Sequence, residues 1–316
     1  MYFLKRILFA VPLLLVISAL AFALVHLAPG GPFDRERAPA SPEIERNLKA
    51  AYHLDEPVWK QYLRFFGLVW QKKDATGQWH HEPASFNISY KYRSHRVSDI
   101  IDQALPVSMT LGALAFGFAL CVGLPLGFVT AARRGQWPDF AGSFLAVLAV
   151  CVPGFVVGPL LILIFSIKLH WLPVALWESP AHMILPAIAL GLFFSGKIAR
   201  LFREGMMGVM QSEFIAAARA KGMTENILLL KHTVRIAILP VVSFSGPMLA
   251  DLLTGSFVIE NIFQIPGIGV FFINSALNSD YTVAVDLALL YAVLLIVLNL
   301  LVDFSYTLLD PRVKYE

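Results

Sequence analysis

Long apolar segments without charge constrain this chain more than any other feature. Ile7 to Leu27, Val107 to Ala132 and Phe140 to Ile167 contain no Asp, Glu, Lys or Arg. A bilayer core about 30 Å thick requires about 20 apolar residues in a helix, because hydrocarbon offers no partners for backbone N–H and C=O groups. These three segments therefore predict membrane-spanning helices.

Three further segments have the length of membrane spans but carry some charge. They run from Pro180 to Arg200, from Ile236 to Ile259 and from Val283 to Leu308. With 57% hydrophobic and only 15% charged residues, the chain lacks the composition of a soluble enzyme. Its 25 basic and 22 acidic residues leave a net charge of only +3, which indicates no nucleic-acid partner. The predicted fold class is an all-α polytopic membrane protein with six transmembrane helices in a lipid bilayer.

The distribution of basic residues predicts the orientation of the spans. Among the short loops and ends, one side of the membrane carries Lys5, Arg6, Arg133, Arg134, Lys197, Arg200, Arg203, Arg219, Lys221, Lys231, Arg235, Arg312 and Lys314, whereas the other carries Lys168. Positive charge in short loops is retained in the cytoplasm, so both termini are expected there. A cleaved signal peptide is the alternative for the N-terminus, but its apolar region is typically about 7–15 residues long.

This topology divides the chain into three parts. Residues 1–27 form the cytoplasmic N-terminus and first helix, residues 28–105 form an extracytoplasmic cap, and residues 106–316 form the transmembrane core with a cytoplasmic loop at 203–235. Within the cap, helices are expected from Ser41 and between Pro57 and Trp70. The uncharged stretch from 261 to 279 contains Pro266-Gly267-Ile268-Gly269, which favours a short re-entrant or surface element over a seventh span.

Motifs for catalysis or metal binding are weak. Cys121 and Cys151 lie in apolar runs and predict small buried side chains without a disulfide. His80-His81-Glu82 lacks the ligand spacing of a metal site. The phosphate-loop pattern from Gly191 to Lys197 is followed by Ile198 instead of a hydroxyl residue and lies within a span. We therefore predict no catalytic residue, no metal and no cofactor.

The segment from 203 to 235 carries the most specific local pattern. Ser212 is an N-cap candidate, Glu213 lies in the first turn of the expected helix, and Gly222 can end that helix in a left-handed turn. The alanine-rich face between these ends would allow a partner backbone to approach closely. The same pattern also fits a helix lying on anionic lipid, and spacing alone does not separate the two interpretations.

Several motifs together resemble a known family. They are Leu27-Ala28-Pro29-Gly30-Gly31-Pro32, Tyr52-His53-Leu54-Asp55-Glu56-Pro57, Ala217-Ala218-Arg219-Ala220-Lys221-Gly222, Val258-Ile259-Glu260, Pro266-Gly267-Ile268-Gly269, Ala276-Leu277-Asn278, Asp280-Tyr281 and Leu309-Asp310-Pro311-Arg312. Over essentially its whole length, the chain resembles the peptide group of inner-membrane permeases of ATP-binding-cassette (ABC) importers. The resemblance implies the type I ABC importer permease architecture and a location in a bacterial inner membrane.

The resemblance also implies a site and partners. The segment from Phe214 to Lys231 looks like the coupling loop that docks on a cytoplasmic ATPase, with Glu213, Phe214, Ala217, Ala218, Arg219, Ala220, Lys221 and Gly222 as its site residues. This chain has Ala216 where the family usually has glutamate, which leaves the docking ion pair open. The implied partners are a homologous second permease, two ABC ATPase subunits, an extracytoplasmic peptide-binding protein and an oligopeptide substrate moved by alternating access.

Acidic residues within spans are further candidates for function, because charge in hydrocarbon is costly. Asp251 can line the translocation pathway, bind a facing hydroxyl group or pair with the second permease, whereas Asp286 and Asp303 lie nearer span ends. Within the same family, the cargo could instead be dipeptides, glutathione-like peptides or nickel chelates. An ion-coupled secondary transporter and a non-transporting scaffold are alternatives from other classes.

Overall fold

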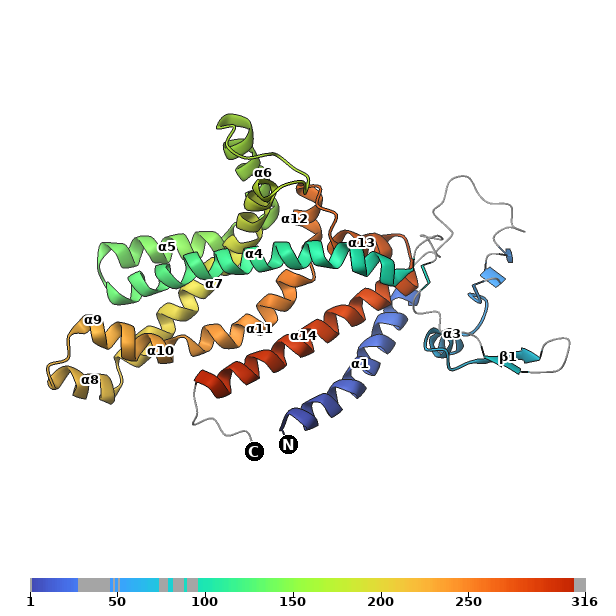
Figure 1. Ribbon diagram of the computed structural model, residues 1–316, viewed down its shortest axis with the longest axis horizontal. Coiled ribbons are helices and arrows are strands. Elements are labelled where there is room, and N and C mark those ends of the chain that lie inside the picture. Colours follow the sequence, from blue (N-terminus) through green and yellow to red (C-terminus); the bar gives the residue numbers. More distant parts are fainter. Residues whose placement is uncertain are drawn as a thin grey trace. The chain divides into compact units, whose positions relative to one another are not determined.

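Two compact units make up the structure, a computed structural model that describes residues 2–27, 46–47, 49–50, 52–73, 79–81, 88–89 and 96–309. Unit 1 comprises Met1–Ala104 and Ile268–Leu294, and unit 2 comprises Leu105–Gly267 and Leu295–Glu316. Helices α4 (Val97–Ala132) and α14 (Tyr281–Leu309) contribute residues to both units. Figure 1 labels the elements along the chain.

Apolar helices long enough to cross a bilayer dominate the described residues. Five such segments are present. They are α1 (Tyr2–Leu27), α4, α7 (Pro180–Met210), the pair α11 (Leu239–Leu253) and α12 (Phe257–Ile262), and α14. They correspond to the first, second, fourth, fifth and sixth predicted spans, although α4 begins ten residues earlier and α7 ends ten residues later than predicted.

The third predicted span is wrong as a single helix. The chain forms α5 (Trp137–Cys151), breaks at Val152 and Pro153, and continues as α6 (Gly154–Leu161) and the π-helix η1 (Ile162–Lys168). The two parts are bent by 103°. Pro153 lacks an N–H group and disfavours a helical conformation at the preceding residue, and Val152 is indeed extended. This segment is a sixth span only if the bent pair crosses the membrane as one.

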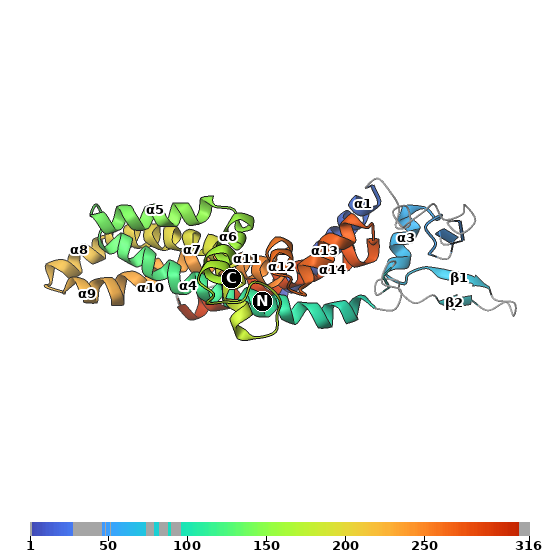
Figure 2. The same cartoon turned by 90° about the horizontal axis from the view of Figure 1, so that it is seen from above.

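Close backbone contacts hold the helices of unit 2 together. Gly123 and Gly127 of α4 face α7, where an added Cβ would lie 2.7 Å from Ser195 O and 2.5 Å from Ala199 O. Small residues at this spacing allow membrane helices to pack closely. Helices α5 and α7 also lie side by side (Figures 1 and 2). The main core contains Phe194, Ile198, Phe202, Met206, Met248 and Leu252 among its buried residues.

Aromatic packing joins α1 to α3 (Val58–Phe65) in unit 1. Phe22 packs edge-on against Tyr62 and Phe65, and the Tyr62 hydroxyl lies 2.7 Å from the Ser18 hydroxyl. This confirms a helix after Pro57, although it ends at Phe65. The predicted helix start at Ser41 lies outside the described residues. The strands β1 (Trp70–Lys73) and β2 (Trp79–His81) form an antiparallel hairpin that the sequence analysis did not predict.

Beyond the last two residues of α12, the stretch from 261 to 279 contains one short helix, α13 (Ile268–Leu277). Its ten residues span about 15 Å, half the thickness of a bilayer core. The helix is therefore too short to cross the membrane, in agreement with the prediction of a short element.

Candidate functional site

A compact run of short helices connects α7 to α11 within unit 2. It comprises α8 (Glu213–Ala220), α9 (Glu225–Ile227), the π-helix η2 (Leu228–Thr233) and α10 (Val234–Ala237). We call this run, residues 211–238, the connecting segment. It contains the loop singled out by the sequence. Helices α8 and α9 lie at the same end of unit 2 as the turn between α4 and α5 (Figures 1 and 2).

The start of α8 differs in detail from the prediction. Ser212 occupies the N-cap position with an extended backbone, but its hydroxyl donates to Val209 O at 2.6 Å rather than accepting from the first turn of α8. The side chain therefore closes the end of α7. Glu213 is the first residue of α8, where a negative charge favours the helix dipole.

The end of α8 has the predicted left-handed glycine. Gly222 has φ +83°, and its N–H donates to Arg219 O at 3.0 Å. The N–H of Met223 donates to Ala218 O at 3.3 Å. These two bonds form a Schellman motif, which satisfies carbonyl groups at the helix end and reverses the chain. Gly222 thus sets the direction in which the chain leaves α8.

One face of α8 is buried and the rest is open. Ile215 is fully buried, and α8 contacts both α7 and η2. Of the predicted site residues, Ala218 is half-buried, while the others are exposed: Glu213, Phe214, Ala217, Arg219, Ala220, Lys221 and Gly222. The structure therefore places these residues together on one short helix and its C-terminal turn, held to the protein through Ile215.

An ion pair closes the turn after α8. Arg219 Nε donates to Glu225 Oε1 at 2.6 Å, and both side chains are about half exposed. This hydrogen bond raises the pKa of Arg219 above its usual value. The ion pair joins α8 to α9, so the charge of Arg219 is already paired within the connecting segment, whereas Lys221 is exposed beside it.

Exposed apolar residues extend this surface beyond the predicted site. Phe214 is 46% exposed, Ile227 50% and Leu230 62%. Ile227 and Leu230 were not among the predicted site residues, because they flank the buried Leu228 and Leu229 in a continuous apolar run. Leu230 belongs to the π-helix η2, in which Thr233 Oγ1 donates to Leu228 O at 3.1 Å. The connecting segment thus exposes the large apolar side chains of Phe214, Ile227 and Leu230.

The connecting segment is firmly attached to the spans. Gly205 of α7 packs on α10, where an added Cβ would lie 2.6 Å from Ala237 O. Arg203 of α7 donates from Nε to Asp139 Oδ1 at 2.9 Å and from its terminal nitrogen to Oδ2 at 3.0 Å. Asp139 also accepts from the N–H of Gly135, so this bidentate pair joins α7 to the turn between α4 and α5.

The acidic residues of the spans have different surroundings. Asp251 lies on α11 and its side chain is exposed on this chain. Asp286 Oδ2 is buried and has no hydrogen-bond partner among the described residues. Glu260, which belongs to the Val258-Ile259-Glu260 motif, is fully buried and accepts from the Ser108 hydroxyl at 2.7 Å. Its packing against Gly255 and Gly267 makes it a structural element of the α11–α12 region.

Comparison with protein families matches both parts of the chain. The model described as "Binding-protein-dependent transport system inner membrane component" matches residues 123–315. The model for the N-terminal part of such membrane components matches residues 1–112. Two related family models thus cover nearly the whole chain.

Curated relatives match over almost their full length. The oligopeptide transport system permease protein OppB of Escherichia coli strain K12 is 40% identical over 316 residues, covering 99% of each chain. OppB of Haemophilus influenzae is 39% identical, covering 98% of each chain. The dipeptide transport system permease protein DppB of Bacillus subtilis is 40% identical, covering 99% of this chain and 97% of the relative.

A solved structure shares the fold at low sequence identity. The inward-facing MetNI methionine ABC transporter has a chain with a TM-score of 0.50 and 17% identity, covering 69% of this chain and 98% of that one. The predicted class, an all-α polytopic membrane protein of the type I ABC importer permease architecture, is confirmed. The chain belongs to the family of inner membrane components of binding-protein-dependent transport systems.

Proposed function

We propose that this chain is a permease subunit of an ATP-driven importer that moves oligopeptides across the bacterial inner membrane. The structural observation that supports this proposal is the exposed surface of α8, which is held by the buried Ile215 and the Schellman turn at Gly222. The near-full-length identity of about 40% to OppB supports the cargo. DppB of Bacillus subtilis is equally similar, so dipeptides are the competing cargo.

The chain acts within a larger complex in this proposal. Two cytoplasmic ABC ATPase subunits supply ATP hydrolysis, and one of them binds α8 through Phe214 and the alanine face. A homologous second permease completes the pathway, and an extracytoplasmic peptide-binding protein delivers the substrate to the cap formed by residues 28–105. Both termini and the connecting segment lie in the cytoplasm, as the basic residues predict.

Coupling follows from how α8 is attached. When the ATPase dimer closes on ATP, the bound α8 moves with it, and Ile215 transmits this movement to η2 and α7. The close contact of Gly205 with α10 makes α7 and α10 move together. The spans thereby change between inward-open and outward-open arrangements, as in other two-state transporters. Asp251, exposed on α11, is the candidate for lining the pathway.

Purification of the chain from its native membrane in mild detergent tests the complex. We expect a second permease and two nucleotide-binding subunits to co-purify and to hydrolyse ATP. Uptake of a labelled pentapeptide into proteoliposomes, with unlabelled dipeptide or pentapeptide as competitor, then tests the cargo. Recovery of the chain alone, with uptake driven by an ion gradient, would contradict the proposal, and stronger competition by dipeptide would contradict the oligopeptide assignment.

A further inference from the structure

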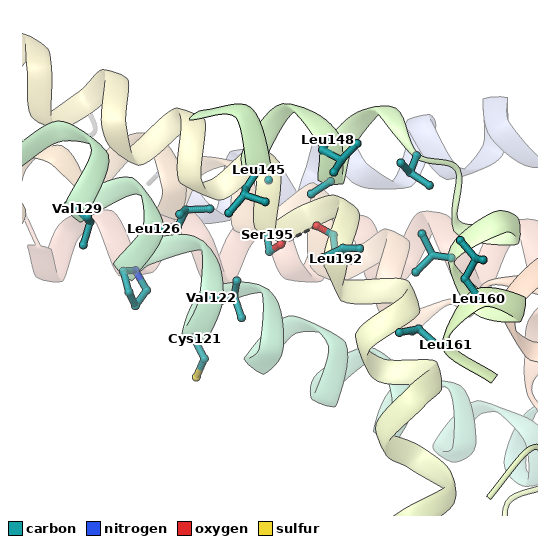
Figure 3. A pocket seen from close by; sticks show the side chains of 15 residues that line it. Cys121, Val122, Leu126, Val129, Leu145, Leu148, Leu160, Leu161, Leu192 and Ser195 are labelled. Atoms are coloured by element: carbon teal, nitrogen blue, oxygen red, sulfur yellow. Dashed lines mark hydrogen bonds between the residues drawn. The ribbon is translucent and has the colours of Figure 1, made fainter. Parts of the chain in front are cut away.

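An apolar groove lies along the membrane-spanning part of unit 2. Its volume is about 730 Å³, and it is lined by residues of α4, α5, α6 and α7 together with Val152. Figure 3 shows Val122, Leu126 and Val129 of α4 on one side, and Leu145 and Leu148 of α5 on the other. The bend after α5 brings Leu160 and Leu161 to one end of the groove.

The chemistry of the walls suits hydrocarbon. No charged residue lines the groove, and its one hydroxyl group belongs to Ser195. That hydroxyl donates to Leu192 O at 2.6 Å, the bond drawn in Figure 3, so its hydrogen atom is already used. The wall also contains Ala149, whose side chain is a single methyl group. Apart from the weak donor of the Cys121 thiol, the lining side chains offer no free hydrogen-bond donor to a polar ligand, whereas an acyl chain needs none.

A basic residue follows on the same face of α4. Val122, Leu126, Val129 and Arg133 are spaced by four, three and four residues, which places them on one side of a helix. The helical hydrogen bonding reaches this residue, because the N–H of Arg133 donates to Val129 O at 3.0 Å. Arg133 is exposed, and Trp137 close by is 79% exposed. Arg and Trp at the end of a span are typical of the membrane–water interface.

The electrostatic surroundings favour an anion at this end. The nearby carboxylate of Asp139 is bound by Arg203 through two hydrogen bonds, which offsets its negative charge. Neither Arg133 nor Arg134 has an ion-pair partner within the parts of the chain that the structure describes. Basic sites between membrane helices bind anionic head groups.

We propose that this groove binds an acyl chain of an anionic phospholipid whose phosphate contacts Arg133. The hydrocarbon chain fills the space between α4 and α5 and extends toward the bend at α6. The guanidinium group of Arg133 binds the phosphate with charge-assisted hydrogen bonds. The lipid thereby supports the bent third segment on the side that the groove leaves open. The site is independent of the proposed peptide cargo.

Lipid retention by the assembled complex tests the proposal. The complex is purified from nanodiscs of phosphatidylglycerol and phosphatidylethanolamine in equal amounts, transferred to lipid-free detergent and analysed for bound phospholipid by native mass spectrometry. We expect retained phosphatidylglycerol to exceed phosphatidylethanolamine by about fivefold, the preference that one basic residue near a membrane surface provides. Arg133→Gln should remove this preference, whereas Arg134→Gln, which changes the neighbouring side chain off the groove face, should keep it.

A substitution that fills the groove tests acyl-chain binding separately from phosphate binding by Arg133. Ala149→Trp places a ring in the groove and should abolish retention, whereas Val147→Trp, on an exposed part of α5 outside the groove, should not. Equal loss in both Arg variants, or retention in Ala149→Trp, would overturn the proposal.

A native thiol provides a readout that does not depend on these variants. After Cys151→Ser, Cys121 in the groove wall is the single cysteine of this chain. A small fluorophore on Cys121 should be quenched by phospholipids with a nitroxide on the acyl chain. Absence of quenching, together with cross-linking of Cys121 to the second permease, would identify a protein occupant and refute the lipid site.

Discussion

Replacement of Gly222 tests the docking surface most directly. The residue has φ +83°, and no heavy atom lies within 4 Å of the position that a Cβ would take. A side chain therefore meets no neighbour, and its whole cost is the left-handed backbone, about 1–2 kcal/mol. The Schellman bonds from Gly222 and Met223 are the contacts that an opened turn would lose. Gly222→Ala should shift the turn toward open conformations by about 5–30-fold.

A graded series separates conformation from charge. Asn tolerates the left-handed region, so Gly222→Asn should couple better than Gly222→Ala. Gly222→Glu adds a negative charge beside Arg219 and Lys221 and should abolish coupled uptake while the chain still inserts into the membrane. The assay is ATP-dependent peptide uptake into proteoliposomes by the complete complex, with membrane insertion measured by protease accessibility.

Gly135 provides a matched control for this series. It has φ +74°, a Cβ added to it would likewise meet no heavy atom within 4 Å, and it lies in the turn between α4 and α5 at the same end of unit 2. Gly135→Ala has a similar backbone cost but leaves α8 unchanged, so uptake should be nearly normal. Normal uptake by Gly222→Glu, or an equal loss in Gly135→Ala and Gly222→Ala, would refute the docking assignment.

Three further substitutions probe the anchoring of α8, the pathway and the α11–α12 region. Ile215→Ala should cost about 2–5 kcal/mol of local stability and speed hydrogen exchange in α8. Phe214→Ala should leave hydrogen exchange unchanged and weaken ATPase binding about tenfold. The reverse pattern would show that Phe214 anchors α8 and that Ile215 contacts the ATPase. Asp251→Asn should reduce uptake of peptides with a free amino terminus more than uptake of N-acetylated peptides, and an equal reduction would argue against pathway lining. Gly267→Ala would place a Cβ 2.5–2.6 Å from the Glu260 carboxylate oxygens, so its overpacking should cost about 1–3 kcal/mol, seen as a lower melting temperature of the complex; an unchanged value would contradict this packing.

Hydropathy predicted most of the membrane helices, because burial in lipid imposes a length and an absence of charge that a single sequence displays. Segments such as Ile7 to Leu27 satisfy both requirements without help from neighbouring helices. The left-handed turn at Gly222 was predictable for the same reason, since its cause is local. The N-cap function of Ser212 was not, because its hydroxyl finds a competing acceptor in Val209 O at the end of α7.

Features that depend on tertiary packing were missed. Ile227 ends α9 and Leu230 lies in the π-helix η2; both are exposed, whereas Leu228 and Leu229 between them are buried, and an unbroken apolar run does not show which side chains face outward. The bidentate contact of Asp139 with Arg203 joins residues 64 positions apart, and nothing in either local sequence indicates the other. The fully buried Glu260 accepts a hydrogen bond from Ser108, which lies 152 residues away.

The prolines show how packing decides between a continuous and a broken helix. Pro125 and Pro153 both lie in apolar segments, and proline favours a kink in each of them. Pro125 remains inside α4, where Gly123 and Gly127 on either side of it contact the α7 backbone and hold the helix in place. Next to Pro153, a Cβ on Gly154 would meet only the tip of the Ile259 side chain, at 3.6 Å. Without such a close glycine contact at this point, the missing N–H group and the extended Val152 produce the 103° bend, and the bend leaves open the groove that we assign to lipid.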